Sequence, residues 1–165
     1  MERYVLSALV QNHAGVLSRV SGLFSRRGYN IDSLTVGETQ EPGVSRMTIV
    51  VRGDEATIEQ IQKQLEKLVE VGAVRLLDFG KSVHRELALV KVSATHQNRS
   101  DIMQIANVFR ARVVDVSHET LTLEVTGDEG KVDGLIELLE PYGIRELART
   151  GIAALDRGSA RLSLI

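Results

Sequence analysis

Apolar and polar residues in the first half of the chain switch repeatedly between a period of two and a period near 3.6. Alternating or β-branched runs predict strands, whereas apolar residues that recur every three or four positions predict helices. The expected helices begin at Val16 and after Asp54, and the expected strands are 4–11, 31–37, 47–51 and 74–79. The predicted order is β-α-β-β-α-β.

Residues at the ends of the two expected helices support this order. Gly28 suits the left-handed end of the first helix. Asp54 is expected to cap the second helix and Gly72 to end it. The apolar face of the first helix is predicted to be Val16, Leu17, Val20, Leu23 and Phe24. The apolar face of the second is predicted to be Ile58, Ile61, Leu65, Leu68 and Val69.

The second half of the chain repeats the order of the first. Gly127-Asp128-Glu129 opens a helix at the point where Gly53-Asp54-Glu55 opens one in the first half. The fold class is therefore predicted to be α+β, with two tandem ferredoxin-like βαββαβ domains. The expected division is 1–80, 84–157 and a tail at 158–165. Because each small domain leaves sheet edges and one sheet face uncovered, an oligomer is expected.

Composition and motifs exclude several classes of function. A net charge of -2 and 4% aromatic residues argue against a nucleic-acid-binding face. The absence of cysteine removes disulfides and thiolate metal sites. The four histidines lie far apart, without metal-ligand spacing, and no nucleophile motif is present, so neither a metal site nor a catalytic site is expected. With no signal peptide or membrane-spanning run, a cytoplasmic protein is expected.

The remaining candidate is the turn from Asn12 to Gly15. A glycine-containing turn before a helix leaves the first helical amides unpaired, which suits a carboxylate. The amide of Asn12 can serve an ammonium, so the turn offers groups that fit a free amino acid. The alternative is structural, because Asn and Gly also favour turns for conformational reasons.

Asn30 is the second candidate, and it lies just past the other end of the same helix. That helix is roughly 20 Å long at 1.5 Å per residue, so Asn30 and the turn at Asn12 cannot contact one small molecule within one chain. Antiparallel pairing of two second strands about a two-fold axis would bring Asn30 of one chain to the turn of the other. Val16, Leu17 and Ile31 could then surround an aliphatic side chain, with core packing as the alternative.

Several motifs resemble one family across nearly the whole chain. The first half resembles an ACT domain, and the chain as a whole is similar to the small regulatory subunit of acetolactate synthase, also called acetohydroxyacid synthase. The motifs are Asn12-x-x-Gly15-Val16-Leu17-Ser18-Arg19-Val20, Phe24-x-x-Arg27-Gly28-Tyr29-Asn30-Ile31, Ser45-Arg46-Met47-Thr48-Ile49, Gln64-Leu65-x-Lys67-Leu68, Phe109-Arg110, Val114-Asp115-Val116 and Ala148-Arg149-x-Gly151. Ala14 stands where the family often has Pro or Ser.

The resemblance implies a regulatory chain without an active site or cofactor of its own. Its partners would be a second copy, through the ACT domains, and a catalytic subunit that carries thiamine diphosphate, Mg and FAD. It would activate that subunit and confer feedback inhibition by valine in branched-chain amino acid biosynthesis. The implied valine-binding residues are Asn12, Ala14, Gly15, Val16 and Leu17, with Asn30 and Ile31 from the partner chain.

Three other functions are compatible with the same order of elements. A stand-alone ACT protein could sense an amino acid for another enzyme or for a transcription factor. An RNA-binding module would need aromatic residues on its central strands, where this chain has Val-Leu-Ser-Ala-Leu and Met-Thr-Ile-Val-Val. An acid-base enzyme would need a pair of carboxylates, which no motif supplies.

Overall fold

The computed structural model describes residues 2–164 and divides into two compact units. The first comprises the chain up to Val83 together with the residues from Ile152 onward, and the second is His84–Gly151. In the part of the chain that is described, no helix is both long and apolar enough to cross a membrane.

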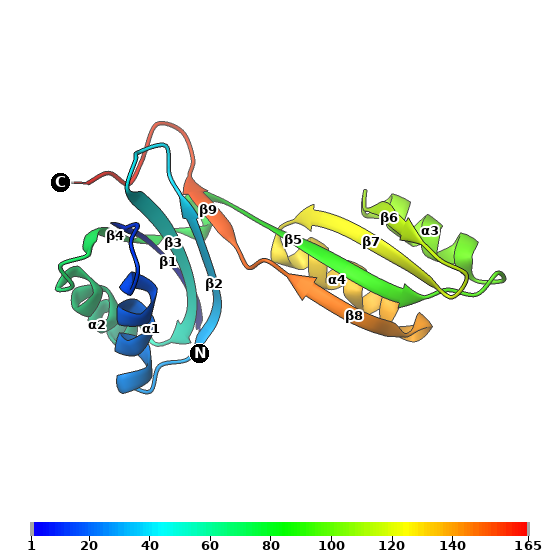
Figure 1. Ribbon diagram of the computed structural model, residues 1–165, viewed down its shortest axis with the longest axis horizontal. Helices are drawn as coiled ribbons and strands as arrows, with labels where there is room; N and C mark the ends of the chain where they lie inside the picture. Colours follow the sequence, from blue (N-terminus) through cyan, green and yellow to red (C-terminus); the bar gives the residue numbers. More distant parts are fainter. Residues whose placement is uncertain (1, 165) are drawn as a thin grey trace. The chain divides into compact units, whose positions relative to one another are not determined.

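The first unit is an antiparallel sheet with two helices on one face (Figure 1). Its elements are β1 (Glu2–Gln11), α1 (Val16–Arg26), β2 (Ile31–Glu38), β3 (Val44–Gly53), α2 (Glu55–Glu66) and β4 (Val71–Leu77). The strand order β2-β3-β1-β4 places β2 at one edge and β4 at the other. The core between helices and sheet includes Leu6, Val20, Phe24, Ile49, Ile61 and Leu65.

The predicted helix ends are confirmed at two positions and wrong at a third. Gly28 has φ +70° just after α1, and the Asp54 carboxylate accepts a hydrogen bond from the Thr57 amide at 2.7 Å. Gly72, however, does not end α2, because the helix already stops at Glu66 and Gly72 lies inside β4. Val69, expected on the buried helix face, is 85% exposed.

Pairing with β1 explains why β4 begins before Gly72. Val71 pairs with Val10 across the sheet and is buried, so the strand starts where its side chain can enter the core. Gly72 makes room for the C-terminal tail. A Cβ at this position would lie 2.2 Å from Cδ2 of Leu164, so the absence of a side chain lets the tail pack against the strand.

The C-terminal segment covers the second face of the first sheet. A short strand β9 (Ala153–Asp156), which the sequence pattern did not predict, follows Ile152. Ile152 and Ala154 form a second buried cluster with the sheet residues Val5, Val50 and Leu77. The expected domain range 84–157 included this segment, whereas by its contacts it packs with the first unit. An ion pair of 2.6 Å between Arg75 and Asp156 anchors it on β4.

This packing predicts that a fragment ending at Val83 is less stable than the complete unit. Without the C-terminal segment, Val5, Val50 and Leu77 lose their apolar cover. We expect the free energy of unfolding in urea to be lower by about 3 kcal/mol than in a version that joins Val83 to Ile152 through a flexible linker. As a control, Ile152→Asp with Ala154→Asp in the linked version should remove the gain. Equal stability of the fragment and the linked version would contradict the prediction.

The second unit repeats the architecture of the first. Its elements are β5 (Ser82–Ser93), which begins in the first unit, followed by α3 (Arg99–Val108), β6 (Arg112–Val116), β7 (Thr120–Gly127), α4 (Glu129–Leu139) and β8 (Ile144–Arg149). The strand order β6-β7-β5-β8 matches that of the first sheet. Asp128 caps α4 as Asp54 caps α2, since its carboxylate accepts from the Lys131 amide at 2.9 Å. The predicted tandem ferredoxin-like architecture is thus confirmed.

Candidate functional site

The turn between β1 and α1 has the backbone geometry that a glycine permits. Gly15 occupies the position before the helix with φ +89°, in the left-handed region. The Asn12 amide N–H donates to the Gly43 carbonyl at 2.9 Å, and Asn12 Nδ2 donates to Glu38 Oε1 at 2.7 Å. These bonds tie the turn to both sides of the loop that connects β2 and β3, and they leave Asn12 Oδ1 as an acceptor.

The start of α1 differs from the starts of α2 and α4. Asp54 and Asp128 cap those helices with their carboxylates, whereas α1 follows Gly15 without a side-chain cap and has no acidic residue in its first turn. Within the described residues, no side chain therefore caps the amide groups at the start of α1. This end of the helix is therefore suited to an anionic group from outside.

The neighbouring apolar candidates have different roles. Val16 is buried in the first core, so its side chain anchors the start of α1 there and does not face the solvent. Leu17 and Ala14 are exposed beside the turn, and Leu17 is available to an apolar ligand group. Ile31 is half-buried against the first core at the start of β2.

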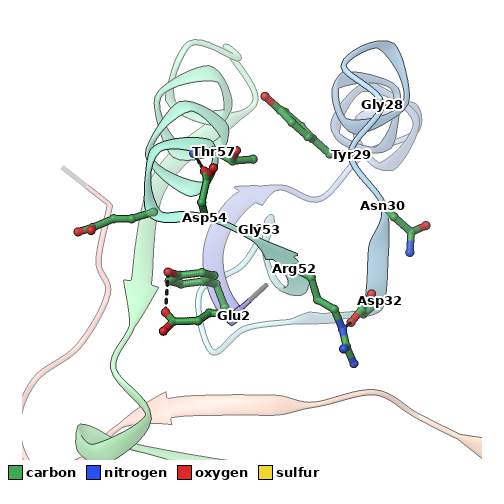
Figure 2. Close-up of a pocket in the computed structure, with 11 residues that line it drawn as sticks. Glu2, Gly28, Tyr29, Asn30, Asp32, Arg52, Gly53, Asp54 and Thr57 are labelled. Carbon is green, nitrogen blue, oxygen red and sulfur yellow. Dashed lines mark hydrogen bonds and ion pairs between the residues drawn. The ribbon is translucent and has the colours of Figure 1, made fainter.

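Asn30 lies at the other end of α1, on the rim of a cleft of about 850 Å³. The cleft separates the end of α1 from the start of α2, and its wall includes Tyr29, Arg52 and Thr57. Figure 2 shows Tyr29 extending toward α2, whereas the side chain of Asn30 points away from that helix. The amide of Asn30 is exposed and free to meet another molecule.

The structure does not bring the two parts of the predicted site together within one chain. The cleft at Asn30 has no wall residue from the Asn12–Leu17 turn. Between them stands α1, with 11 residues and a length of about 16 Å. Because β2 lies at the sheet edge and pairs only with β3 in the described residues, a second chain can approach there.

Several of the polar groups around the cleft are engaged with one another. Arg52 forms an ion pair of 2.6 Å with Asp32. Hydrogen bonds from Thr57 hold the pKa of the Asp54 carboxyl below its usual value. The Tyr4 hydroxyl donates to Glu2 at 2.9 Å, which raises the pKa of Tyr4. This set contains no free acid-base pair, and no cluster of three or more potential metal ligands occurs in residues 2–164.

Comparison with known proteins then decides the family. A model described as an acetohydroxyacid synthase (AHAS) small subunit-like ACT domain matches residues 6–73. A second model, for the small subunit of acetolactate synthase, matches residues 85–158. The chain belongs to the family of acetolactate synthase small subunits. The expected ACT domain in the first half is confirmed.

Individual family members align over nearly their full lengths. A probable acetolactate synthase small subunit of Methanothermobacter thermautotrophicus is 54% identical over 159 residues, which cover 96% of this chain and 95% of the relative. The small subunit of Mycobacterium bovis is 52% identical, covering 94% and 92%. The crystal structure of the small subunit from Thermotoga maritima superposes with a TM-score of 0.90 at 44% identity, covering 97% of this chain and 100% of that one.

Glu38 is the polar neighbour of the turn that the sequence pattern did not reveal. It lies 26 positions from Asn12 and reaches it only because the β2–β3 hairpin returns to the end of β1. The sequence pattern also did not reveal the ion pair of 3.1 Å between Arg19, in the first turn of α1, and Glu70, just before β4. Neither pair has a local sequence signal, since each joins residues that are far apart in the sequence.

Proposed function

We propose that this chain is the regulatory subunit of an acetolactate synthase, that it activates a separate catalytic subunit, and that it mediates feedback inhibition by valine. Family membership supports the partnership with a catalytic subunit. The observation that carries the valine site is the uncapped start of α1 behind Gly15, next to the amide of Asn12. Catalysis, with thiamine diphosphate, Mg and FAD, would belong to the partner and not to this chain.

The proposed valine site uses groups from two chains. The carboxylate of valine would accept from the first amides of α1, where the helix dipole favours an anion. Its ammonium would donate to Asn12 Oδ1, because Glu38 already holds Nδ2. Antiparallel pairing of two β2 edges would add Asn30 and Ile31 of the second copy, and Leu17 would contact the isopropyl group. Each dimer would therefore hold two valines.

Inhibition would follow from linkage between valine and the arrangement of the dimer. Valine contacts both chains, so it stabilises the arrangement in which the two halves of each site are closest. If that arrangement activates the catalytic subunit less well, valine lowers activity without reaching the active site.

A reconstituted assay tests this function directly. The purified chain is mixed with the acetolactate synthase catalytic subunit from the same source, and acetolactate formation is followed with and without valine. We expect the chain to raise the rate and valine to lower it only when the chain is present. An unchanged rate, with no co-elution of the two proteins, would reject this function. The result would then favour a stand-alone amino-acid sensor, which titration calorimetry with valine would identify.

A further inference from the structure

The face of the first sheet that points away from the helices carries a row of hydroxyl side chains. In the strand register, Thr48 on β3 lies between Ser7 on β1 and Thr35 on β2. Val50, two residues beyond Thr48, belongs to the same face and packs with the C-terminal segment. Ser7 is fully buried and Thr48 is 3% exposed, so the row is largely shielded from water. A charge beside this row is therefore poorly screened by solvent.

A groove of about 350 Å³ opens beside this row. Its walls include Thr35, Thr48 and Arg46 from the sheet and residues 153–155 from the C-terminal segment. Gly37 also lines the groove, directly opposite Arg46 in the strand register, and a Cβ added there would meet no atom within 4 Å. The groove therefore has open space above β2, and its volume lies within the range of small-molecule sites.

Arg46 brings into the groove a positive charge that no carboxylate of the described residues neutralises at ion-pair distance. Its Nη1 donates to Ser7 Oγ at 2.6 Å. Burial lowers the pKa of the Arg46 guanidinium, and the charge of Asp156 offsets this only in part. Asp156 itself forms an ion pair of 2.6 Å with Arg75. Two arginines thus share one carboxylate, which leaves one positive charge uncompensated.

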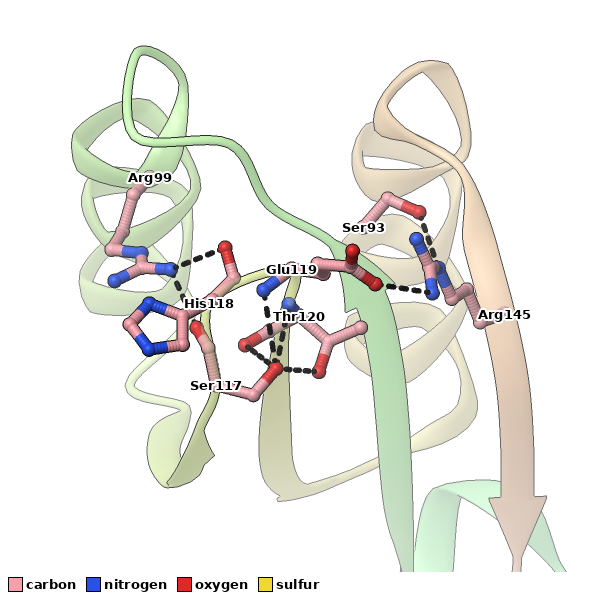
Figure 3. Close-up of polar contacts among 7 residues, drawn as sticks. All are labelled: Ser93, Arg99, Ser117, His118, Glu119, Thr120 and Arg145. Carbon is pink, nitrogen blue, oxygen red and sulfur yellow. Dashed lines mark hydrogen bonds and ion pairs between the residues drawn. The ribbon is translucent and has the colours of Figure 1, made fainter.

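Other arginines of the chain have the contacts that Arg46 lacks. In the second unit, Arg99 Nη2 donates to two backbone carbonyl groups in the turn after β6, at 2.6 and 3.3 Å (Figure 3). On β3, Arg52 lies six residues beyond Arg46 and pairs with Asp32 at 2.6 Å. Arg46 differs from both, because its hydrogen-bond partner within the described residues is a neutral hydroxyl.

Glu38 does not supply the missing negative charge, although it also contributes to the groove wall. Successive residues of a strand point to opposite faces of the sheet. Because Gly37 pairs with Arg46, the side chain of Glu38 lies on the helix face, where its Oε1 accepts from Asn12 at 2.7 Å. The guanidinium of Arg46 therefore stays available to an anion that enters the groove.

We propose that this groove binds a small aliphatic carboxylate. The guanidinium of Arg46 would donate to the carboxylate, with the hydroxyl row beside it. Ala153 and Leu155 are exposed and would contact a short alkyl chain. The groove lies on the face of the sheet opposite the helices, so this site is separate from the proposed valine site at the start of α1. It requires neither valine binding nor the catalytic subunit.

Titration with propionate tests the site, and propionamide is the matched neutral ligand. Binding is followed by saturation-transfer NMR on the complete chain. The chain carries Gly15→Asp, so that the start of α1 does not take up a second propionate. We expect a Kd of about 1 mM for propionate, because a few charge-assisted hydrogen bonds carry the contact. Propionamide should bind at least about tenfold more weakly, since it lacks the charge.

Two groove variants and one control locate the binding. Arg46→Gln should raise the propionate Kd at least about tenfold, because it removes the positive charge. Gly37→Leu should have a similar effect, because its side chain fills the groove while Arg46 stays in place. Arg52→Gln is the matched control on the same strand. It should leave the Kd unchanged, since Arg52 does not line the groove.

Several outcomes would overturn the proposal. Propionate might fail to bind, propionamide might bind equally well, or either groove variant might leave the Kd unchanged. Binding of propionate to the native chain but not to Gly15→Asp would place the ligand at the start of α1 and also overturn it. Both groove variants keep the turn at Asn12, so valine inhibition should persist in them. Failure of this site and failure of the valine site are thereby distinguished.

Discussion

Replacing Gly15 with aspartate is expected to abolish inhibition by valine while activation of the catalytic subunit is retained. The position has φ +89°, and a Cβ there would meet no atom within 4 Å, so the fold can accept the side chain with local backbone strain only. The new carboxylate would stand at the uncapped start of α1, where we place the carboxylate of valine. Loss of that charge-assisted contact should raise the valine Kd at least about a hundredfold.

Titration calorimetry measures the affinity for valine. The reconstituted assay measures separately whether the variant still activates the catalytic subunit. Gly158→Asp is the matched control, because Gly158 also has a positive φ of +69° with no atom within 4 Å of a Cβ. It introduces the same charge in the C-terminal segment and should leave valine affinity unchanged. If Gly15→Asp remained sensitive to valine, the site would lie elsewhere.

A mixing experiment tests whether the site is shared between chains. Asn30→Ala should also lose valine binding, because it removes the contribution of the second chain. In a mixed dimer of Gly15→Asp and Asn30→Ala chains, both changes fall on one site and the other site is intact. An equimolar mixture should therefore recover about a quarter of the native sites at native affinity. No recovery would indicate a site confined to one chain, which the length of α1 argues against.

The sequence predicted those parts of the fold whose signals are local. Gly28 and the aspartates Asp54 and Asp128 act within three residues of their own position, and all three lie where the pattern placed them. The end of α2 depended on the pairing of Val71 with Val10, which no local pattern contains. Strand β9 was missed because four residues are too few to show a period, and its stability comes from the sheet it covers.

The candidate site shows the same limit. The turn at Gly15 could be anticipated from its own residues. The separation of Asn30 from this turn could be anticipated from the length of one helix. The partner of Asn12 could not, because Glu38 reaches it across the hairpin. The valine-binding assignment itself stays a prediction, to which the structure adds the uncapped start of α1 as physical support.

A buried carboxylate in the second unit leads to the largest expected effect on stability. Glu86 on β5 is buried, with 5% of its side chain exposed, and it pairs with Arg149 on β8. Arg149 also binds Asp133 on α4 at 2.7 Å. Burial by itself would lower the pKa of Arg149, but the hydrogen bonds and charges of Glu86 and Asp133 outweigh it and raise the pKa. Among the ion pairs of the described residues, Arg149 is the only cation beside Glu86.

Arg149→Met is therefore expected to destabilise the second unit by about 3 kcal/mol, since it leaves a buried carboxylate without its counter-charge. Hydrogen exchange of the Val90 and Leu123 amides, in the centre of that sheet, should accelerate by about a hundredfold. Asp133→Asn should cost less than about 1 kcal/mol, because Asp133 is 53% exposed. Adding Glu86→Leu to Arg149→Met should recover most of the loss, because it removes the unpaired charge. If the double variant were as unstable as Arg149→Met, packing by the arginine stem would be the cause.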